Sequence, residues 1–134
     1  MNRNIRVAKD LIRLAKSLVA EESVADQEGK YKGFTGRIEW KGTSGSVENA
    51  TFELVDDSLC LVKWHGGTWN DGYWLSGAWE NGMWKDGWWY NGTWHKGTWE
   101  NGNWIDGIWR NGEWKGGKDC RDNFHPEGDS PDKW

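Results

Sequence analysis

The chain of 134 residues has few of the side chains that usually form a protein core. Val, Ile, Leu and Phe together number only 21, about 16% of the sequence, a level typical of chains that stay unfolded. The sequence instead contains 14 Trp and 19 Gly. We therefore expect tryptophan to supply most of the buried apolar surface of one small domain.

Other shortages exclude classes of function. No run of about 18 apolar residues is present to span a bilayer, and the net charge of -4 argues against a nucleic-acid binder held by phosphate contacts. The first 20 residues carry charges throughout and lack a signal-peptide pattern, so we expect no Sec-type secretion. Cys60 and Cys120 lie far apart and predict neither a disulfide framework nor a metal site.

Residues 1–22 have the apolar spacing of an amphipathic α-helix. The apolar face is formed by Ile5, Leu11, Ile12, Leu18 and Val19. This segment sums to a charge of +2 and the rest of the chain to -6. Such a helix caps the chain's own core, docks on another protein, lies on a membrane surface, or serves as a transit peptide. We expect a cap or a docking element, followed by a polar linker over residues 23–32.

Residues 33–63 contain short β-prone runs separated by Gly, Ser, Asn and Asp. None of these runs alternates long enough to predict a broad sheet. We expect an irregular β segment with strands of three to five residues.

A five-residue repeat, Trp-x-x-Gly-x, occupies residues 64–117. Its tryptophans are Trp64, Trp69, Trp74, Trp79, Trp84, Trp89, Trp94, Trp99, Trp104, Trp109 and Trp114. Asn or Asp precedes the repeat Gly in seven of the eleven units, and Asx-Gly pairs supply the positive φ angles of tight turns. The chain is therefore predicted to turn once every five residues, with Trp inside and the following residue outside.

Two mainly β architectures fit this period. One is a short-strand β-solenoid, for which we expect four sides per coil, with Gly and Trp filling a narrow lumen. The other is an antiparallel meander of hairpins with all Trp on one face. The purest set of Asx turns recurs every ten residues, which suits either architecture. The solenoid is favoured because the meander leaves a row of indoles uncovered.

The run WENGMWKDG resembles Trp-Gly pentapeptide-repeat proteins of bacteria and large bacteriophages, and the likeness covers residues 64–117. Residues 4–18 are similar to the start of phage-encoded virion or hypothetical proteins. Ala50-Thr51-Phe52 is similar to the core of ordinary pentapeptide-repeat solenoids, and the Gly-x-Trp units share the composition of membrane-occupation (MORN) repeats. The repeat lacks the Leu or Phe centre of the former and the longer period of the latter. The functions of these similar proteins are mostly unassigned. If the chain is phage-encoded, we expect it in the virion or in the host cytoplasm.

The sequence contains no recognisable catalytic motif, and we expect no cofactor and no metal. His65 and His95 follow repeat tryptophans, so they are predicted to be exposed. Cys120 and His125 form a lone pair in a polar tail, residues 118–134, which is too little for a metal site. Trp134, which ends the sequence, is predicted either to fold back as a plug or to dock on another chain.

Tyr73, Trp88 and Tyr90 lie next to repeat tryptophans and are predicted to point to the face opposite the core. Exposed aromatic rings anchor protein partners or stack on sugars. We therefore expect a non-enzymatic structural or interaction protein, plausible as a phage component, that binds a protein partner or assembles with itself. The alternative is a glycan-binding or adhesion module.

Overall fold

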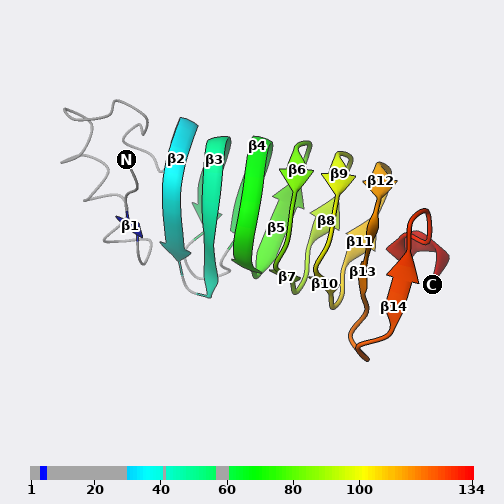
Figure 1. Cartoon of the computed structure of the whole chain (residues 1–134). Helices are drawn as coiled ribbons and strands as arrows, with labels where there is room; N and C mark the ends of the chain where they lie inside the picture. The colour runs from blue at the N-terminus through cyan, green and yellow to red at the C-terminus, as the bar shows by residue number, and fades with distance from the viewer. Residues whose placement is uncertain (1–3, 6–29, 41, 57–60) are drawn as a thin grey trace.

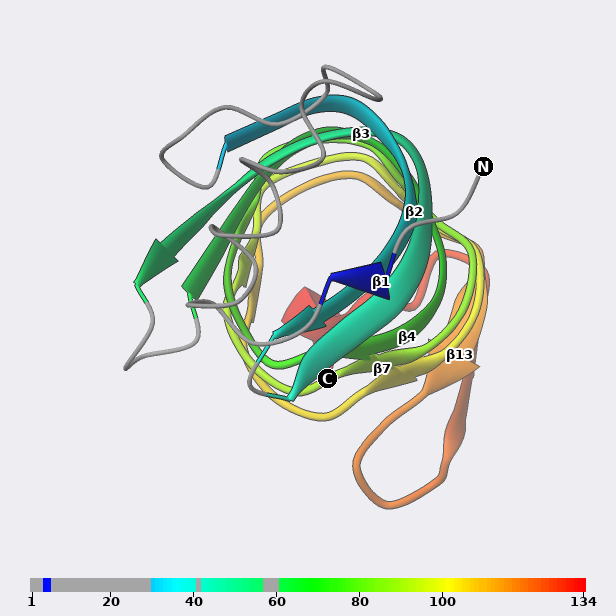
Figure 2. The ribbon, with the colours of Figure 1, turned by 90° about the vertical axis from the view of Figure 1, so that its left-hand side faces the viewer.

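The computed structural model describes residues 4–5, 30–40, 42–56 and 61–134. In this part of the chain the fold is a β-solenoid whose coils lie side by side along one axis (Figure 1). Seen along that axis, the strands form a ring around a filled lumen (Figure 2). Among the described residues, no helix is long and apolar enough to cross a membrane.

Three long strands precede the short strands of the repeat in the described part of the chain: β2 (Lys30–Trp40), β3 (Thr43–Asp56) and β4 (Leu61–Trp74). Strand β3 pairs antiparallel with both β2 and β4. The expectation of strands of three to five residues was therefore wrong. Register shifts interrupt both the β2/β3 and the β3/β4 pairings, so each strand bends around the lumen without ending. The sequence pattern indicates only the short straight segments between these bends.

Strand β4 is also the first coil of the solenoid, because later strands pair with it in parallel at three places. Trp64 pairs with Trp79 and Trp79 with Trp94, so each coil takes 15 residues. The later strands are β5 (Ser76–Trp79), β6 (Met83–Trp84), β7 (Trp88–Trp89), β8 (Thr93–Trp94), β9 (Thr98–Trp99), β10 (Asn103–Trp104), β11 (Ile108–Trp109), β12 (Glu113–Trp114) and β13 (Gly116–Lys118). Three five-residue sides therefore make one coil, which corrects the expected four.

The eleven repeat tryptophans fill the lumen as three columns, and each is at most 6% exposed. Rings one coil apart stack with nearly parallel planes, their centroids 4.7–5.2 Å apart. Successive rings along the chain meet edge to face at 5.7–5.9 Å. Both geometries suit the ring quadrupole. Three indoles meeting edge to face leave no room in the cross-section, and a fourth side would open a void.

The repeat glycines form the corners between the sides. Gly97, for example, has a φ of +121°, and a Cβ placed on it would lie 2.3 Å from the carbonyl oxygen of Gly82 in the preceding coil. Only glycine combines that torsion with so close a backbone approach. At most Asx-Gly corners the Asx side chain accepts a hydrogen bond from the glycine N–H, as Asn91 does from Gly92 at 2.8 Å. This confirms the predicted turn every five residues.

Different structures close the two ends of the columns. At the N-terminal end, Phe52 stacks on Trp64 and Tyr31 on Phe52, so smaller aromatics continue one column. At the other end, strand β14 (Phe124–Pro126) pairs antiparallel with β13, and a short 3-10 helix, η1 (Pro131–Lys133), follows. The C-terminus lies over the lumen in Figure 2, while the turn between β13 and β14 projects from the ring. Residues 118–134, which we expected as a polar tail, thus form a cap on this end of the solenoid.

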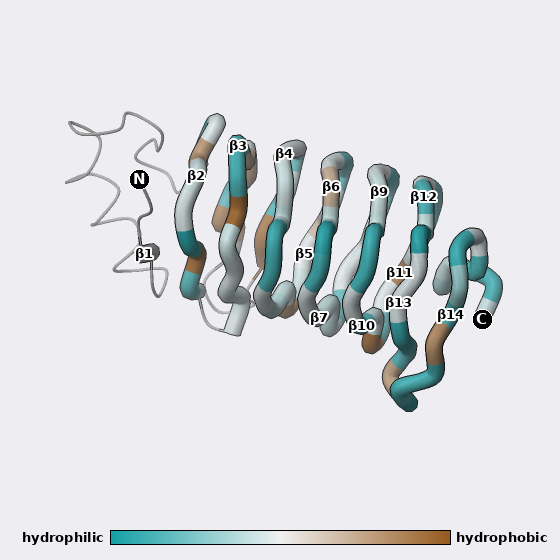
Figure 3. Tube along the Cα trace, in the orientation of Figure 1, coloured by the Kyte–Doolittle hydropathy of each residue, from teal (hydrophilic) through white to brown (hydrophobic). Residues whose placement is uncertain are grey.

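The expected N-terminal helix falls mostly outside the described residues, including Leu11, Ile12, Leu18 and Val19. Asn4–Ile5 is described, and it forms a strand, β1, parallel to Arg37 and Ile38 of β2, where we expected helix. Strand β2 begins at Lys30, inside the expected linker. Figure 3 shows few strongly hydrophobic residues along the repeat, because Trp and Gly lie near the middle of the hydropathy scale.

Candidate functional site

The structure brings Tyr73, Trp88 and Tyr90 together on the outer surface of one side of the solenoid. Tyr73 on β4 is in register with Trp88 on β7. The Tyr73 ring lies 6.5 Å from Trp88 and 6.0 Å from Tyr90, and the rings of Trp88 and Tyr90 are 6.2 Å apart. Tyr73 is 45% and Trp88 40% exposed. We call these three residues the aromatic face.

The aromatic face has apolar and polar neighbours in the adjoining coils. Leu75 and Ile105 occupy the positions equivalent to Tyr90 one coil before and one coil after it, and both are half-buried. Asn103 on β10 pairs with Trp88 on β7, and Lys118 on β13 pairs with Asn103. The face is therefore a small apolar ribbon bordered by groups that form hydrogen bonds. Tyr73 and Trp88 are exposed, as predicted, and Tyr90 is half-buried.

His65 lies between two carboxylates, an arrangement that we did not predict from the sequence. Its Nδ1 is 2.7 Å from Oε1 of Glu80, and its Nε2 is 2.7 Å from Oε2 of Glu53. Desolvation lowers the pKa of His65, but the hydrogen bonds and charges of Glu53 and Glu80 outweigh it, so the net pKa is raised. His65 is half-buried rather than exposed as predicted, because β3 and the next coil both pack beside it, whereas His95 is exposed.

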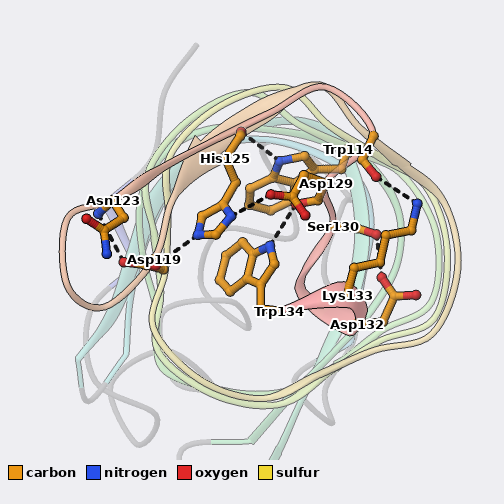
Figure 4. A network of polar contacts seen from close by, with 10 residues as sticks. Trp114, Asp119, Asn123, His125, Asp129, Ser130, Asp132, Lys133 and Trp134 are labelled. Atoms are coloured by element: carbon orange, nitrogen blue, oxygen red, sulfur yellow. Dashed lines mark hydrogen bonds and ion pairs between the residues drawn. The ribbon is translucent and has the colours of Figure 1, made fainter.

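A second histidine, His125, organises the C-terminal cap (Figure 4). Its Nε2 is 2.8 Å from Oδ2 of Asp119, and its Nδ1 is 2.7 Å from Oδ2 of Asp129. Desolvation lowers the pKa of His125, but hydrogen bonds with Asp119 and Asp129 and their charges raise it overall. The pKa of Asp119 falls to about 2, first through its hydrogen bond with His125 and then through the backbone N–H groups of Asn123 and Arg121.

Trp134 folds back as a plug, the first of the two predicted roles. Its ring stacks on His125 at 3.9 Å and meets the last-layer Trp114 edge to face at 5.4 Å. The Trp134 indole N–H donates to the carbonyl of Asp129 at 2.7 Å, and that of Trp114 donates to the carbonyl of His125 at 3.1 Å. His125 therefore contacts Trp134 through its ring and Trp114, in the last core layer, through its backbone carbonyl.

The two histidine sites differ in how far the sequence signals them. Glu80 is one coil, 15 residues, after His65, so the pair becomes visible once the coil length is known. Asp129 follows His125 by four residues, but that spacing is too common in polar tails to be informative. Cys120 is a free, exposed cysteine in the cap, and Cys60 lies outside the described residues. No group of three or more His, Cys, Asp and Glu side chains in the described part is placed to hold a metal ion.

No protein-family model, curated protein or solved structure matches the chain at a significant level. The resemblance to Trp-Gly pentapeptide-repeat proteins therefore stays a prediction. The structure itself establishes a Trp-rich β-solenoid with coils of about 15 residues.

Proposed function

We propose that this chain is a non-enzymatic interaction protein: a rigid Trp-cored solenoid that presents its aromatic face to a protein surface, with a second copy of itself as the partner to test first. The supporting observation is the gathering of Tyr73, Trp88 and Tyr90 on one side, two of them at least 40% exposed. Aromatic residues of this kind are enriched where interfaces gain most of their binding energy.

The fold does not require these three aromatic residues. None of the other positions equivalent to Tyr73 and Trp88 in the repeat holds an aromatic residue. These positions hold small or polar residues such as Thr93, Thr98 and Asn103, and the aliphatic Met83 and Ile108. The regular repeat leaves the outer positions free to vary, so large apolar rings at adjacent outer positions point to a contact. Two such faces related by a two-fold axis are self-complementary.

The test compares variants by sedimentation velocity over a range of concentrations. We expect Trp88→Ala combined with Tyr73→Ala to weaken self-association at least tenfold. Ile108→Ala is the matched control, because Ile108 holds the equivalent position on another side and is 53% exposed. A native chain that stays monomeric at every concentration contradicts the second copy as partner. Equal effects of the two changes contradict the assignment of the face.

A glycan is the second candidate, favoured by the orientation of the rings. The three planes are inclined to one another by only 18–35°, and nearly parallel exposed rings can stack on the apolar faces of sugars. Affinity electrophoresis in gels containing soluble polysaccharides tests this. Retardation that Trp88→Ala abolishes and Ile108→Ala leaves unchanged favours a glycan. Unchanged mobility in every gel removes the candidates tested.

A further inference from the structure

We propose that the C-terminal cap is a proton-controlled latch: residues 119–134 close over the last indole layer while the imidazole of His125 carries both of its protons, and open when it loses one. The proposal concerns the end of the solenoid and is independent of the aromatic face.

The geometry of His125 requires two donors. Its two ring nitrogens each face a carboxylate oxygen, of Asp119 and of Asp129, at 2.8 and 2.7 Å. An imidazolium donates from both nitrogens, whereas a neutral imidazole has one N–H and one lone pair. Deprotonation therefore turns one of the two hydrogen bonds into a contact between a lone pair and a carboxylate oxygen.

The carboxylate of Asp119 cannot easily turn away from that contact. Oδ1 of Asp119 accepts the backbone N–H groups of Arg121 at 2.8 Å and Asn123 at 3.0 Å, which fixes this carboxylate in the turn between β13 and β14. The carbonyl of Asp129 accepts the indole N–H of Trp134 at 2.7 Å, so the backbone of Asp129 is tied to the plug. The two partners of His125 thus belong to the two ends of the cap.

The stacking of Trp134 on His125 also depends on the protonation of the imidazole. The His125 and Trp134 rings are 3.9 Å apart and inclined by 21°, a geometry in which a cation over the indole face is attracted to it. Protonation therefore strengthens the stacking that holds Trp134 against Trp114. Loss of the proton weakens the carboxylate contacts and the stacking together.

The other charged groups of the cap do not replace His125. Lys115 pairs with Glu113 and Glu127, Lys118 pairs with Asp122, Lys133 donates to the carbonyl of Gly128, and Asp132 accepts from Ser130. These residues are exposed, apart from Ser130, and their interactions are with one another or with backbone. An open cap uncovers an apolar layer and unpaired strand edges, the features that let other chains add to a sheet.

The sign of the pH effect follows from proton linkage. The pKa of His125 is raised in the closed cap, so closing binds a proton and is favoured at low pH. This contribution is complete below the pKa of the open form and is lost as pH rises through the pKa of the closed form. The closing constant should change tenfold for each unit by which the closed-state pKa exceeds the open-state pKa.

Hydrogen exchange of the full chain, corrected for the intrinsic pH dependence of exchange, tests the latch. The amide of Gly128, which donates to the carbonyl of Trp114 at 2.8 Å, reports on the cap, and the amide of Glu100 reports on the solenoid interior. We expect the protection of Gly128 to fall as pH rises, with the midpoint that an NMR titration gives for the His125 imidazole. The protection of Glu100 should not follow that curve. Constant protection of Gly128 across the His125 titration overturns the proposal.

Variants separate the latch from general loss of stability. His125→Gln should make the protection of Gly128 independent of pH, and Asp129→Asn should move the midpoint to lower pH. His65→Gln is the matched control, because it removes a histidine held in the same way at another site and should leave the midpoint unchanged. A midpoint that His65→Gln shifts and His125→Gln retains overturns the assignment. Retained protection of Glu100 shows that each variant is folded.

Discussion

Replacing a single corner glycine, Gly97→Ala, gives a sharp test of the solenoid. The new methyl group would lie 2.3 Å from the oxygen and 2.9 Å from the nitrogen of Gly82. Both are backbone atoms of the preceding coil, and the Gly82 carbonyl already accepts the N–H of Thr98 at 2.9 Å. The alanine must therefore push two coils apart or leave its position in the corner.

The expected cost combines two terms. A non-glycine residue at a φ of +121° costs about 1–3 kcal/mol in torsional strain. Forcing a methyl group into a filled space costs about another 1–3 kcal/mol. Together the two terms predict that Gly97→Ala reduces the free energy of unfolding by about 2–6 kcal/mol, a large part of the roughly 5–15 kcal/mol typical of a domain.

Gly66→Ala is the matched control within the same repeat. Gly66 has no positive φ, and a Cβ placed there would meet nothing within 4 Å. Its replacement should change stability by no more than about 0.5 kcal/mol. Urea titrations followed by far-ultraviolet circular dichroism measure both changes. Equal effects of the two substitutions would refute the close approach of coils at the corners.

The remaining predictions concern the core and the first histidine. Trp94→Ala should lower the free energy of unfolding by about 3–5 kcal/mol in the same titration, because removing an indole with four ring neighbours leaves a cavity. His95→Gln, at the exposed next position, should lower it by less than about 0.5 kcal/mol. Since Glu53 and Glu80 hold the pKa of His65 above its usual value, the chain should lose stability as pH rises through that raised pKa. In thermal unfolding at a series of pH values, His65→Gln should remove part of this loss. A slope unchanged by His65→Gln would exclude these ion pairs as its source.

The inside and outside of the repeat could be predicted from the sequence, because the period is strict. A large ring every fifth residue with glycine two places before it leaves one arrangement for each unit: Trp inward and the next side chain outward. All eleven repeat tryptophans are buried accordingly. The solenoid was preferred to the meander for a physical reason, the need to cover the indoles, and the parallel pairing of successive coils confirms that preference.

The number of sides could not be predicted from the five-residue period, which is the same for any polygon. It depends on the angle at each glycine corner and on how many indoles fill the cross-section. The Asx turns that recur every ten residues do not indicate the number of sides, because a coil of three five-residue sides places successive members of this set at different corners. Asp71, Asn81 and Asn91, for instance, lie on three different corners.

The ends of the solenoid were harder to predict because they depend on single contacts rather than on a period. The cap is held by hydrogen bonds from individual side chains such as Asp119 and His125, whose partners are known only when the chain has folded back. The bends of β2 and β3 arise from register shifts, and these depend on the partner strand. A sequence pattern carries neither kind of information.

Each five-residue unit separates the residues that build the fold from those that face outward. Trp and Gly occupy two of five positions, and the packing of the coils depends on those two. The other three positions face outward or form the corner, so their identities contribute little to the core. An outward Thr or Asn therefore needs no explanation beyond solubility. Tyr73, Trp88 and Tyr90 do need one, because exposing such rings to water is unfavourable and the solenoid gains no core packing from them. This is the physical ground for proposing an interaction surface there.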